Sequence, residues 1–206
     1  MSLLKNISHK AYDIEKIRYV NFICKNPNVK KKEFMEDKSQ AVNNDKLSYI
    51  SMYYGKNNMV YVTTPVMVCP FGVNQSNGFI MNLQFTNYEN DDKMKEFYLF
   101  IKALEELQKN HIGIDDTNDD LYISQIKRDK HRKYDPNLVV KLPFKRNKFE
   151  LESYNKEGEH MNVLNVPRFC KVQCDIYIDK IWKFNDQYVR SEEHTSELQS
   201  PCNLVC

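Results

Sequence analysis

The stretch Lys127–Lys148 reads KRDKHRKYDPNLVVKLPFKRNK and combines a strand pattern with a concentration of positive charge. Four apolar residues alternate with other residues in its second half: Leu138, Val140, Leu142 and Phe144. The alternate positions hold Val139, Lys141, Pro143 and Lys145. A period of two predicts a β-strand that packs one apolar face on a core and presents its cationic face outward.

The same stretch holds a local excess of positive charge. Its nine basic residues are opposed by two aspartates, a net charge of +7. Arg190–Cys206 resembles the in-frame translation of a sequencing-library adapter, so we leave it out of fold reasoning. The other 189 residues contain 29 basic and 25 acidic residues, which leaves −3 outside Lys127–Lys148. Such a concentration is typical of a surface that binds a polyanion, although charge alone is equally compatible with a solvated loop.

The stretch offers the two kinds of contact that a sequence-tolerant binder of single strands needs, which are cations for phosphates and aromatic faces for bases. The candidate phosphate contacts are Lys127, Arg128, Lys130, Arg132, Lys133, Lys141, Lys145, Arg146 and Lys148. Tyr134 is the best candidate for stacking. Phe144 and Trp182 are weaker candidates, because their strand registers direct them toward the core. A bulge near Asp179 would reverse the direction of Trp182.

Patterns elsewhere predict a mainly β fold with one long helix. Strands are expected at Ile17–Cys24, in a hairpin made by Leu47–Tyr54 and Met59–Val73, at Phe79–Phe85, and from Cys170 to a two-residue turn at Asn185–Asp186. Phe79, Met81, Leu83 and Phe85 are expected to share the core face of one strand. The polar segment Lys25–Lys46 is expected to be a loop.

The helix is predicted from KMKEFYLFIKALEELQKNH, with its start at Asp91 or Asp92 and its end near Gly113. Its apolar stripe recurs at three- and four-residue spacing through Met94, Phe97, Ile101, Leu104 and Leu107. The stripe predicts that one face of the helix packs on the core.

Motifs for catalysis, metals and cofactors are absent from the sequence. Neither G-x-x-x-x-G-K-[ST] nor G-x-G-x-x-G occurs. The acidic loop Asp115–Asp120 has calcium-loop spacing, but Leu121 and Lys127 stand where glycine and glutamate are required. Together with His131 it is the one basis for a nuclease hypothesis, and no second group completes a two-metal site. We therefore expect no catalytic residue, metal or cofactor.

Cysteine spacing and the N-terminal segment indicate an intracellular protein that is not secreted. Cys170 and Cys174 are spaced C-x-x-x-C without a matching His/Cys cluster, which favours buried reduced thiols. The first residues, MSLLKNISHKAYD, contain no long apolar segment, so neither a signal peptide nor a membrane span is expected.

Four motifs resemble one known family in their order and spacing. They are TPVMVCPFGV (Thr64–Val73), GFIMNLQF followed by the helix, KYDPNLVVKLP (Lys133–Pro143) and CDIYIDKIWKFNDQYV (Cys174–Val189). Over Met59–Val189 the chain resembles the single-stranded-DNA-binding proteins of nucleocytoplasmic large DNA viruses, distant relatives of the single-strand binder of a short-tailed coliphage. The resemblance implies an oligonucleotide-binding (OB) β-barrel with an inserted helix.

The resemblance also implies a function and an organisation. The function is non-enzymatic binding of single-stranded DNA during replication and recombination of a viral genome, in the host cytoplasm or nucleus, with viral replication proteins as further partners and no membrane. The alternative is a structural or packaging protein that binds nucleic acid without strand preference. Residues 1–46 are expected to form a strand and polar loop, part of or appended to the barrel. Residues 47–189 are expected to form an OB-fold-like domain truncated in its last hairpin, and residues 190–206 a non-native tail.

Overall fold

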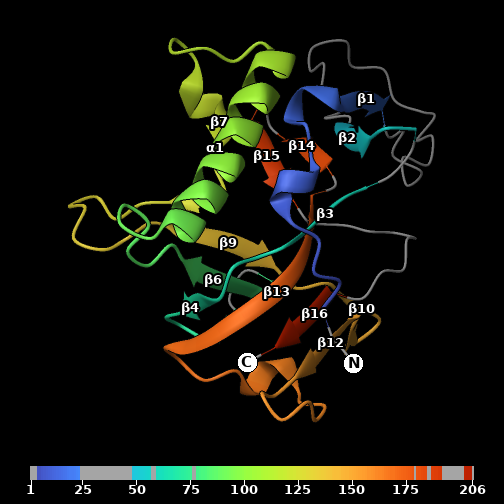
Figure 1. Ribbon diagram of the computed structural model, residues 1–206. Coiled ribbons are helices and arrows are strands. Elements are labelled where there is room, and N and C mark those ends of the chain that lie inside the picture. The colour runs from blue at the N-terminus through green and yellow to red at the C-terminus, as the bar shows by residue number, and fades with distance from the viewer. Residues whose placement is uncertain are drawn as a thin grey trace, which may run out of the picture.

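The computed structural model describes residues 4–23, 48–56, 59–75, 78–178, 180–184, 187–191 and 202–205. These residues form a mainly β fold in which α1 (Asp92–Ile112) is the one α-helix described (Figure 1). The predicted fold class, mainly β with one long helix, is confirmed. Four short 3-10 helices are also present: η1 (His9–Ala11), η2 (Ile14–Lys16), η3 (Asp119–Leu121) and η4 (Val163–Asn165).

Most strands belong to two sheets. The first sheet has the spatial order β1 (Ile17–Ile23), β2 (Ser48–Tyr54), β14 (Lys180–Phe184), β15 (Gln187–Ser191) and β7 (Tyr122–Ile123). The second has the order β12 (Leu151–Tyr154), β16 (Cys202–Val205), β13 (Cys170–Ile178), β4 (Met67–Cys69), β6 (Ile80–Gln84), β9 (Asn137–Lys141) and β8 (Ile126–Lys127). Three further pairings add β3 (Val60–Thr63) to β13, β5 (Val73–Asn74) to β6, and β10 (Phe144–Lys145) to β11 (Lys148–Phe149).

Two of the connections between the two sheets are only one or two residues long. β13 ends at Ile178 and β14 begins at Lys180, so a long run of strand continues from the second sheet into the first. β7 ends at Ile123 and β8 begins at Ile126. This connection joins an edge strand of the first sheet to an edge strand of the second. Neither sheet closes on itself among the described strands, so the prediction of a closed barrel is not confirmed.

The ends of α1 are set by the residues that the sequence indicated. Asp91 is the N-cap, and its Oδ1 accepts a hydrogen bond of 3.0 Å from the backbone N–H of Met94. Gly113 ends the helix in the left-handed conformation at φ 73°, which a glycine adopts without strain. Phe97 and Ile101 are fully buried in the core, as the apolar stripe predicts.

Polar residues of α1 fix the corner between β7 and β8. Leu107 is only half-buried, while Glu105 and Gln108 are fully buried. The Ser124 hydroxyl and the Gln125 backbone N–H donate to Glu105 Oε1 over 2.8 and 2.9 Å. The Tyr122 hydroxyl donates to Gln108 Oε1 over 2.6 Å. The helix thereby holds the segment from which the basic stretch begins, and in Figure 1 it lies above β6 and β9.

The predicted hairpin of Leu47–Tyr54 with Met59–Val73 is wrong. β2 pairs with β1 and β14, whereas β3 pairs with β13. The register places Val62 opposite Ile176 and Val60 opposite Ile178, and all four side chains are buried. Pairing with β13 brings the apolar residues of β3 against those of a long apolar strand.

Several expectations concern residues outside the described ranges. These are the polar loop Lys25–Lys46, with the domain boundary at residue 46, and the bulge at Asp179. The pairing of Phe184 with Gln187 agrees with a two-residue hairpin connection between β14 and β15. Of the adapter-like segment, Arg190 and Ser191 end β15, and Cys202–Val205 form β16.

No helix in the described part of the chain combines the length and the apolar character that a bilayer crossing requires.

Candidate nucleic-acid interface

β6 and β9 form a ladder with one face in the core and one face outside it. On the core face Met81 lies opposite Val140, and Leu83 lies opposite Leu138. The other face holds the half-buried pairs Ile80 with Lys141, Asn82 with Val139, and Gln84 with Asn137. This second face, which we call the open face, lacks the continuous apolar surface that packing against another layer would require.

One row of side chains crosses the open face over five strands. In order from β13 to β8 the directly opposed residues are Lys171, Val68, Gln84, Asn137 and Lys127. Residues directly opposed in a ladder point to the same face. The row therefore begins with exposed Lys171 on β13 and ends with exposed Lys127 on the edge strand β8, with polar and aliphatic side chains between.

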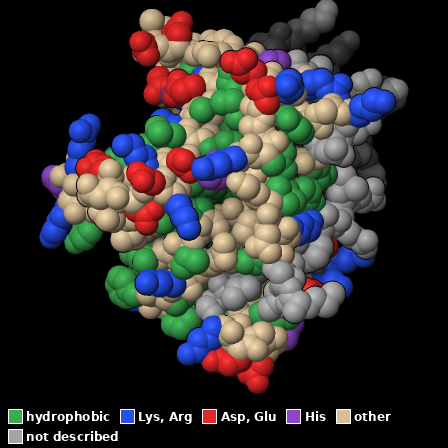
Figure 2. Space-filling model, in the orientation of Figure 1, with side chains coloured by type: hydrophobic (Ala, Val, Ile, Leu, Met, Phe, Trp, Pro, Cys, Tyr) green, Lys and Arg blue, Asp and Glu red, His purple; other side chains and the backbone are tan. Residues whose placement is uncertain are grey.

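The β8–β9 loop, residues 128–136, carries cations at the Asn137 end of the open face. Lys127, Lys130, Arg132 and Lys133 are exposed, and none of these four forms an ion pair within the described residues. Figure 2 shows blue side chains around the projection at the left of the view, where Figure 1 draws this loop in yellow. The cations are thus available to an external polyanion.

The two aspartates of the loop are engaged in bonds to the backbone. Asp129 Oδ2 accepts a hydrogen bond from the backbone N–H of Lys133 over 3.1 Å. Asp135 Oδ2 accepts one from the backbone N–H of Asn87 over 2.7 Å. These bonds shape the loop and tie it to the turn before α1, without pairing the carboxylates with its basic side chains.

Arg128 differs from the other predicted phosphate contacts because its guanidinium is already bonded. It donates to the hydroxyls of Tyr98 and Tyr88 over 2.6 and 3.3 Å, and it lies 5.5 and 5.7 Å from their ring centroids. The hydrogen bonds that Arg128 donates to Tyr88 and Tyr98 raise its pKa above the ordinary value. Arg128 therefore anchors the loop on the start of α1.

Tyr134, the predicted stacking residue, projects from the same loop. Its side chain is 61% exposed, and Lys133 Nζ lies 5.4 Å from its ring centroid. An exposed ring beside an ammonium group can stack on a base while the cation contacts the adjacent phosphate.

The remaining predicted cations lie beyond the other end of β9. β10 and β11 form a hairpin whose two-residue turn, Arg146 and Asn147, has φ 51° and 62°. Such a turn matches the twist of the strands, but an arginine in the left-handed region is strained. Arg146 and Lys148 are exposed, and Lys145 is half-buried.

The side-chain direction predicted for Phe144 is wrong. The alternation of Leu138–Phe144 placed it in the core, yet it is 41% exposed. β9 ends at Lys141, and buried Leu142 is the last residue to follow the alternation before the chain turns into β10. The core register therefore no longer applies at Phe144.

The structure divides the predicted site into two clusters. The cluster at the Asn137 end of β9 consists of Lys127, Lys130, Arg132, Lys133 and Tyr134. The cluster beyond the other end consists of Phe144, Lys145, Arg146 and Lys148. The strand between them spans about 13 Å, from a rise of roughly 3.3 Å per residue. Half-buried Lys141 lies on the open face between the clusters. Trp182 belongs to β14 in the first sheet, opposite Tyr49 and Val189, and its side chain lies outside the description.

Two exposed aromatic residues were missed by sequence reasoning. Phe71 and Phe169 are 58% and 73% exposed, and Phe169 donates its backbone N–H to Cys69 O over 2.7 Å. Phe169 has φ 62°, a strained value for a bulky residue and a frequent mark of functional positions. Pro70-Phe71-Gly72 signals a turn that exposes Phe71, whereas no local pattern identifies Phe169.

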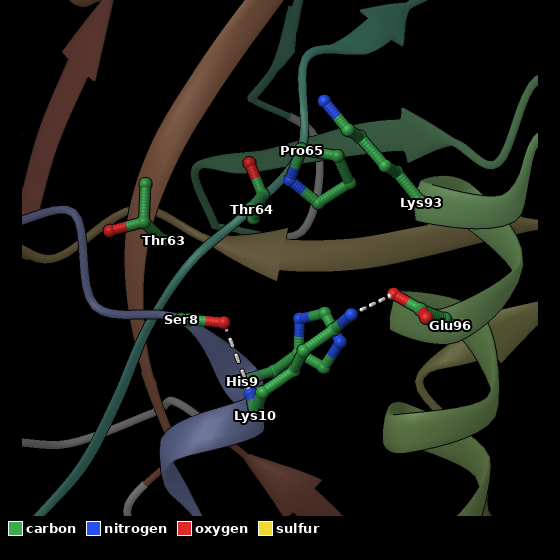
Figure 3. A pocket seen from close by; sticks show the side chains of 8 residues that line it. All are labelled: Ser8, His9, Lys10, Thr63, Thr64, Pro65, Lys93 and Glu96. Carbon is green, nitrogen blue, oxygen red and sulfur yellow. Dashed lines mark hydrogen bonds and ion pairs between the residues drawn. The ribbon is translucent and has the colours of Figure 1, made fainter.

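A pocket of about 370 Å³ lies between η1, the end of β3 and the start of α1 (Figure 3). Its polar groups are largely engaged within the protein. Lys10 Nζ pairs with Glu96 over 2.7 Å, and the Thr63 hydroxyl donates to Asp175 over 2.6 Å. The His9 ring packs on Phe97 at 5.8 Å between centroids, and burial lowers the pKa of His9. The contacts of Lys10 with Glu96 and of His9 with Phe97 attach the N-terminal segment to α1.

No group of three or more His, Cys, Asp or Glu side chains in the described ranges is placed to hold a metal ion. The loop Asp115–Asp120 is organised by its own bonds, since Asp115 Oδ1 accepts from the backbone N–H of Thr117 over 2.8 Å.

Comparison with protein-family descriptions, curated proteins and solved structures found no match to this chain.

Proposed function

We propose that this chain is a non-enzymatic single-stranded-DNA-binding protein. The observation that carries the proposal is the end of β8 and the loop after it, where Lys127, Lys130, Arg132 and Lys133 are exposed without carboxylate partners and Tyr134 is exposed beside Lys133. Cations together with a stacking ring are what a binder of unpaired strands requires. A surface for duplex DNA would need the cations without the ring.

The geometry supports a path for the strand. Phosphates contact Lys130, Arg132 and Lys133, while a base stacks on Tyr134. The strand then follows the open face past Lys141 toward the β10–β11 hairpin. Stacking tolerates any base, and contacts to phosphates carry no sequence information, so binding is expected to be largely independent of sequence.

The biological setting in this proposal comes from the sequence resemblance. The order and spacing of the four motifs support an OB-fold-like barrel and a role in replication and recombination of a large DNA virus. The host cytoplasm or nucleus is the proposed location, with viral replication proteins as further partners. The inserted helix α1, placed between β6 and the β7–β8 corner, is compatible with such a barrel.

Fluorescence anisotropy with labelled oligo-dT and a duplex of equal length tests the proposal. We expect the single strand to bind about tenfold or more tightly, because a base that stacks contributes about 1–3 kcal/mol and a paired base cannot reach the ring. Affinity should also fall steeply as salt rises. Equal affinity for both nucleic acids would contradict the proposal and favour the packaging protein without strand preference.

A further inference from the structure

A second pocket lies beneath the β10–β11 hairpin. It has a volume of about 520 Å³ and is bounded by the hairpin, β12 and the segment around η4. Phe144, Phe149, Asn147, Lys148 and His160 are among its lining residues, and the lining contains no aspartate or glutamate. Sites for small organic groups occupy about 300–1,000 Å³, so this pocket, the hairpin pocket, is large enough for a planar aromatic group.

Aromatic rings form one wall of the hairpin pocket. Phe79, Phe144 and Phe149 pack together with centroid distances of 4.4, 4.8 and 4.9 Å. Phe149 and Phe79 are partly buried against the core, and they hold Phe144 at the pocket with much of its ring open. A ring supported from behind and free in front loses little conformational freedom when another ring stacks on it.

The polar groups at the rim suit a base with its phosphate. Asn147 is exposed and, within the described residues, its side-chain amide has no hydrogen-bond partner. An amide offers both a donor and an acceptor, which is what the edge of a base presents. Exposed Arg146 and Lys148 flank it in sequence and supply positive charge. Arg146 and Asn147 form the turn of the hairpin, and Lys148 follows them as the first residue of β11.

We propose that the hairpin pocket captures one unstacked base of the bound single strand. The base lies on Phe144 with its edge toward Asn147, and the adjacent phosphates contact Arg146 and Lys148. This inference rests on the proposed function and goes beyond it, because it names a defined base pocket separate from the β8–β9 loop. Charge complementarity and ring size select a nucleotide over an apolar peptide as the occupant.

The test compares oligo-dT with an abasic oligonucleotide of the same length, which keeps the phosphates and lacks the bases. Phe144→Ala should weaken oligo-dT binding about fivefold to a hundredfold, the equivalent of one lost stacking contact, and leave abasic binding unchanged. Phe144→Tyr should retain the wild-type affinity for both. The matched control is Leu99→Ala, which removes an exposed apolar side chain far from the hairpin in sequence, on α1. It should change neither affinity.

A second variant keeps the hairpin intact while removing the base-edge contact. Asn147→Gly is expected to fold, because glycine favours the left-handed φ of 62° at this position. It should weaken oligo-dT binding and spare abasic binding. Wild-type binding of oligo-dT with no effect of Phe144→Ala or Asn147→Gly would overturn the base pocket and leave the proposed function standing. Failure of the wild-type chain to bind oligo-dT would reject both.

Discussion

The two ends of β9 carry similar residues in different settings. At the Asn137 end, the β8–β9 loop carries exposed cations and Tyr134, whose side chain is 61% exposed with Lys133 beside its ring. At the other end, the β10–β11 hairpin carries Arg146 and Lys148, and Phe144 lies against a pocket of about 520 Å³. The loop offers charge around a free ring, whereas the hairpin offers a lined cavity.

The difference indicates two separable contributions to binding. Attraction between the loop cations and phosphates falls as salt screens it, with a slope set by the number of contacts. Stacking and burial of a base in a cavity depend far less on salt. We therefore expect the loop to dominate affinity at low salt and the hairpin to account for a larger share of it at high salt.

The largest effect is expected from removing the loop cations. The variant Lys130→Ala/Arg132→Gly/Lys133→Ala should lower oligo-dT affinity about a hundredfold at about 0.1 M salt, and reduce the log–log salt slope by about 2, since each single-strand phosphate contact contributes about 0.7. Glycine is chosen at Arg132 because its φ is 52°. Anisotropy at several salt concentrations measures both quantities.

A charge-matched control separates this site from net charge. Lys16→Ala/Arg18→Ala/Lys56→Ala removes two lysines and one arginine that are exposed near β1 and β2 in the first sheet. This control should change affinity by less than about twofold, since charges beyond about 10 Å from the bound phosphates are largely screened. Equal losses in the two triple variants would show that binding follows total charge instead of this loop.

Tyr134 is expected to have the next largest effect. Tyr134→Ala should reduce oligo-dT affinity about tenfold with little change in salt slope, because it removes a stacking face and no charge. Tyr134→Phe should bind like the wild type, since the ring is retained. If Tyr134→Phe lost as much affinity as Tyr134→Ala, the hydroxyl and not the ring would be the contact.

Arg128 is expected to affect stability more than binding. Arg128→Lys keeps the charge but cannot reach both tyrosine hydroxyls with a planar guanidinium. We expect the free energy of unfolding, measured in urea, to fall by about 1 kcal/mol, and the oligo-dT affinity to change less than about threefold. A loss of affinity comparable to that of the loop variant would instead make Arg128 a direct phosphate contact.

Local patterns predicted the elements whose formation depends on neighbours in sequence. Asp91 and Gly113 bound α1 as expected, and Met81 and Leu83 lie on the core face of β6. These features follow from capping and from the period of two, both of which can be read within a short window. The exposure of Lys130 and Lys133 could likewise be predicted, because the local sequence around them is polar.

Features that depend on distant partners could not be read in this way. β3 pairs with β13, more than a hundred residues away, and not with nearby β2. Position 108 continues the spacing of Ile101 and Leu104, and the polar Gln108 is accommodated there because Tyr122, distant from it in sequence, donates a hydrogen bond to it. The exposure of Phe144 depends on where β9 ends, and the division of the site into two clusters follows from the same turn.

The most direct test of the central claim is a map of contacts between the protein and a single strand. Oligo-dT containing 5-iodouracil is cross-linked to the wild-type chain by light, and the modified residues are identified by mass spectrometry. We expect cross-links at Tyr134 and at Phe144, the aromatic residues at the two ends of β9. Cross-links confined to β1 and β2 in the first sheet, with none at either residue, would contradict that claim.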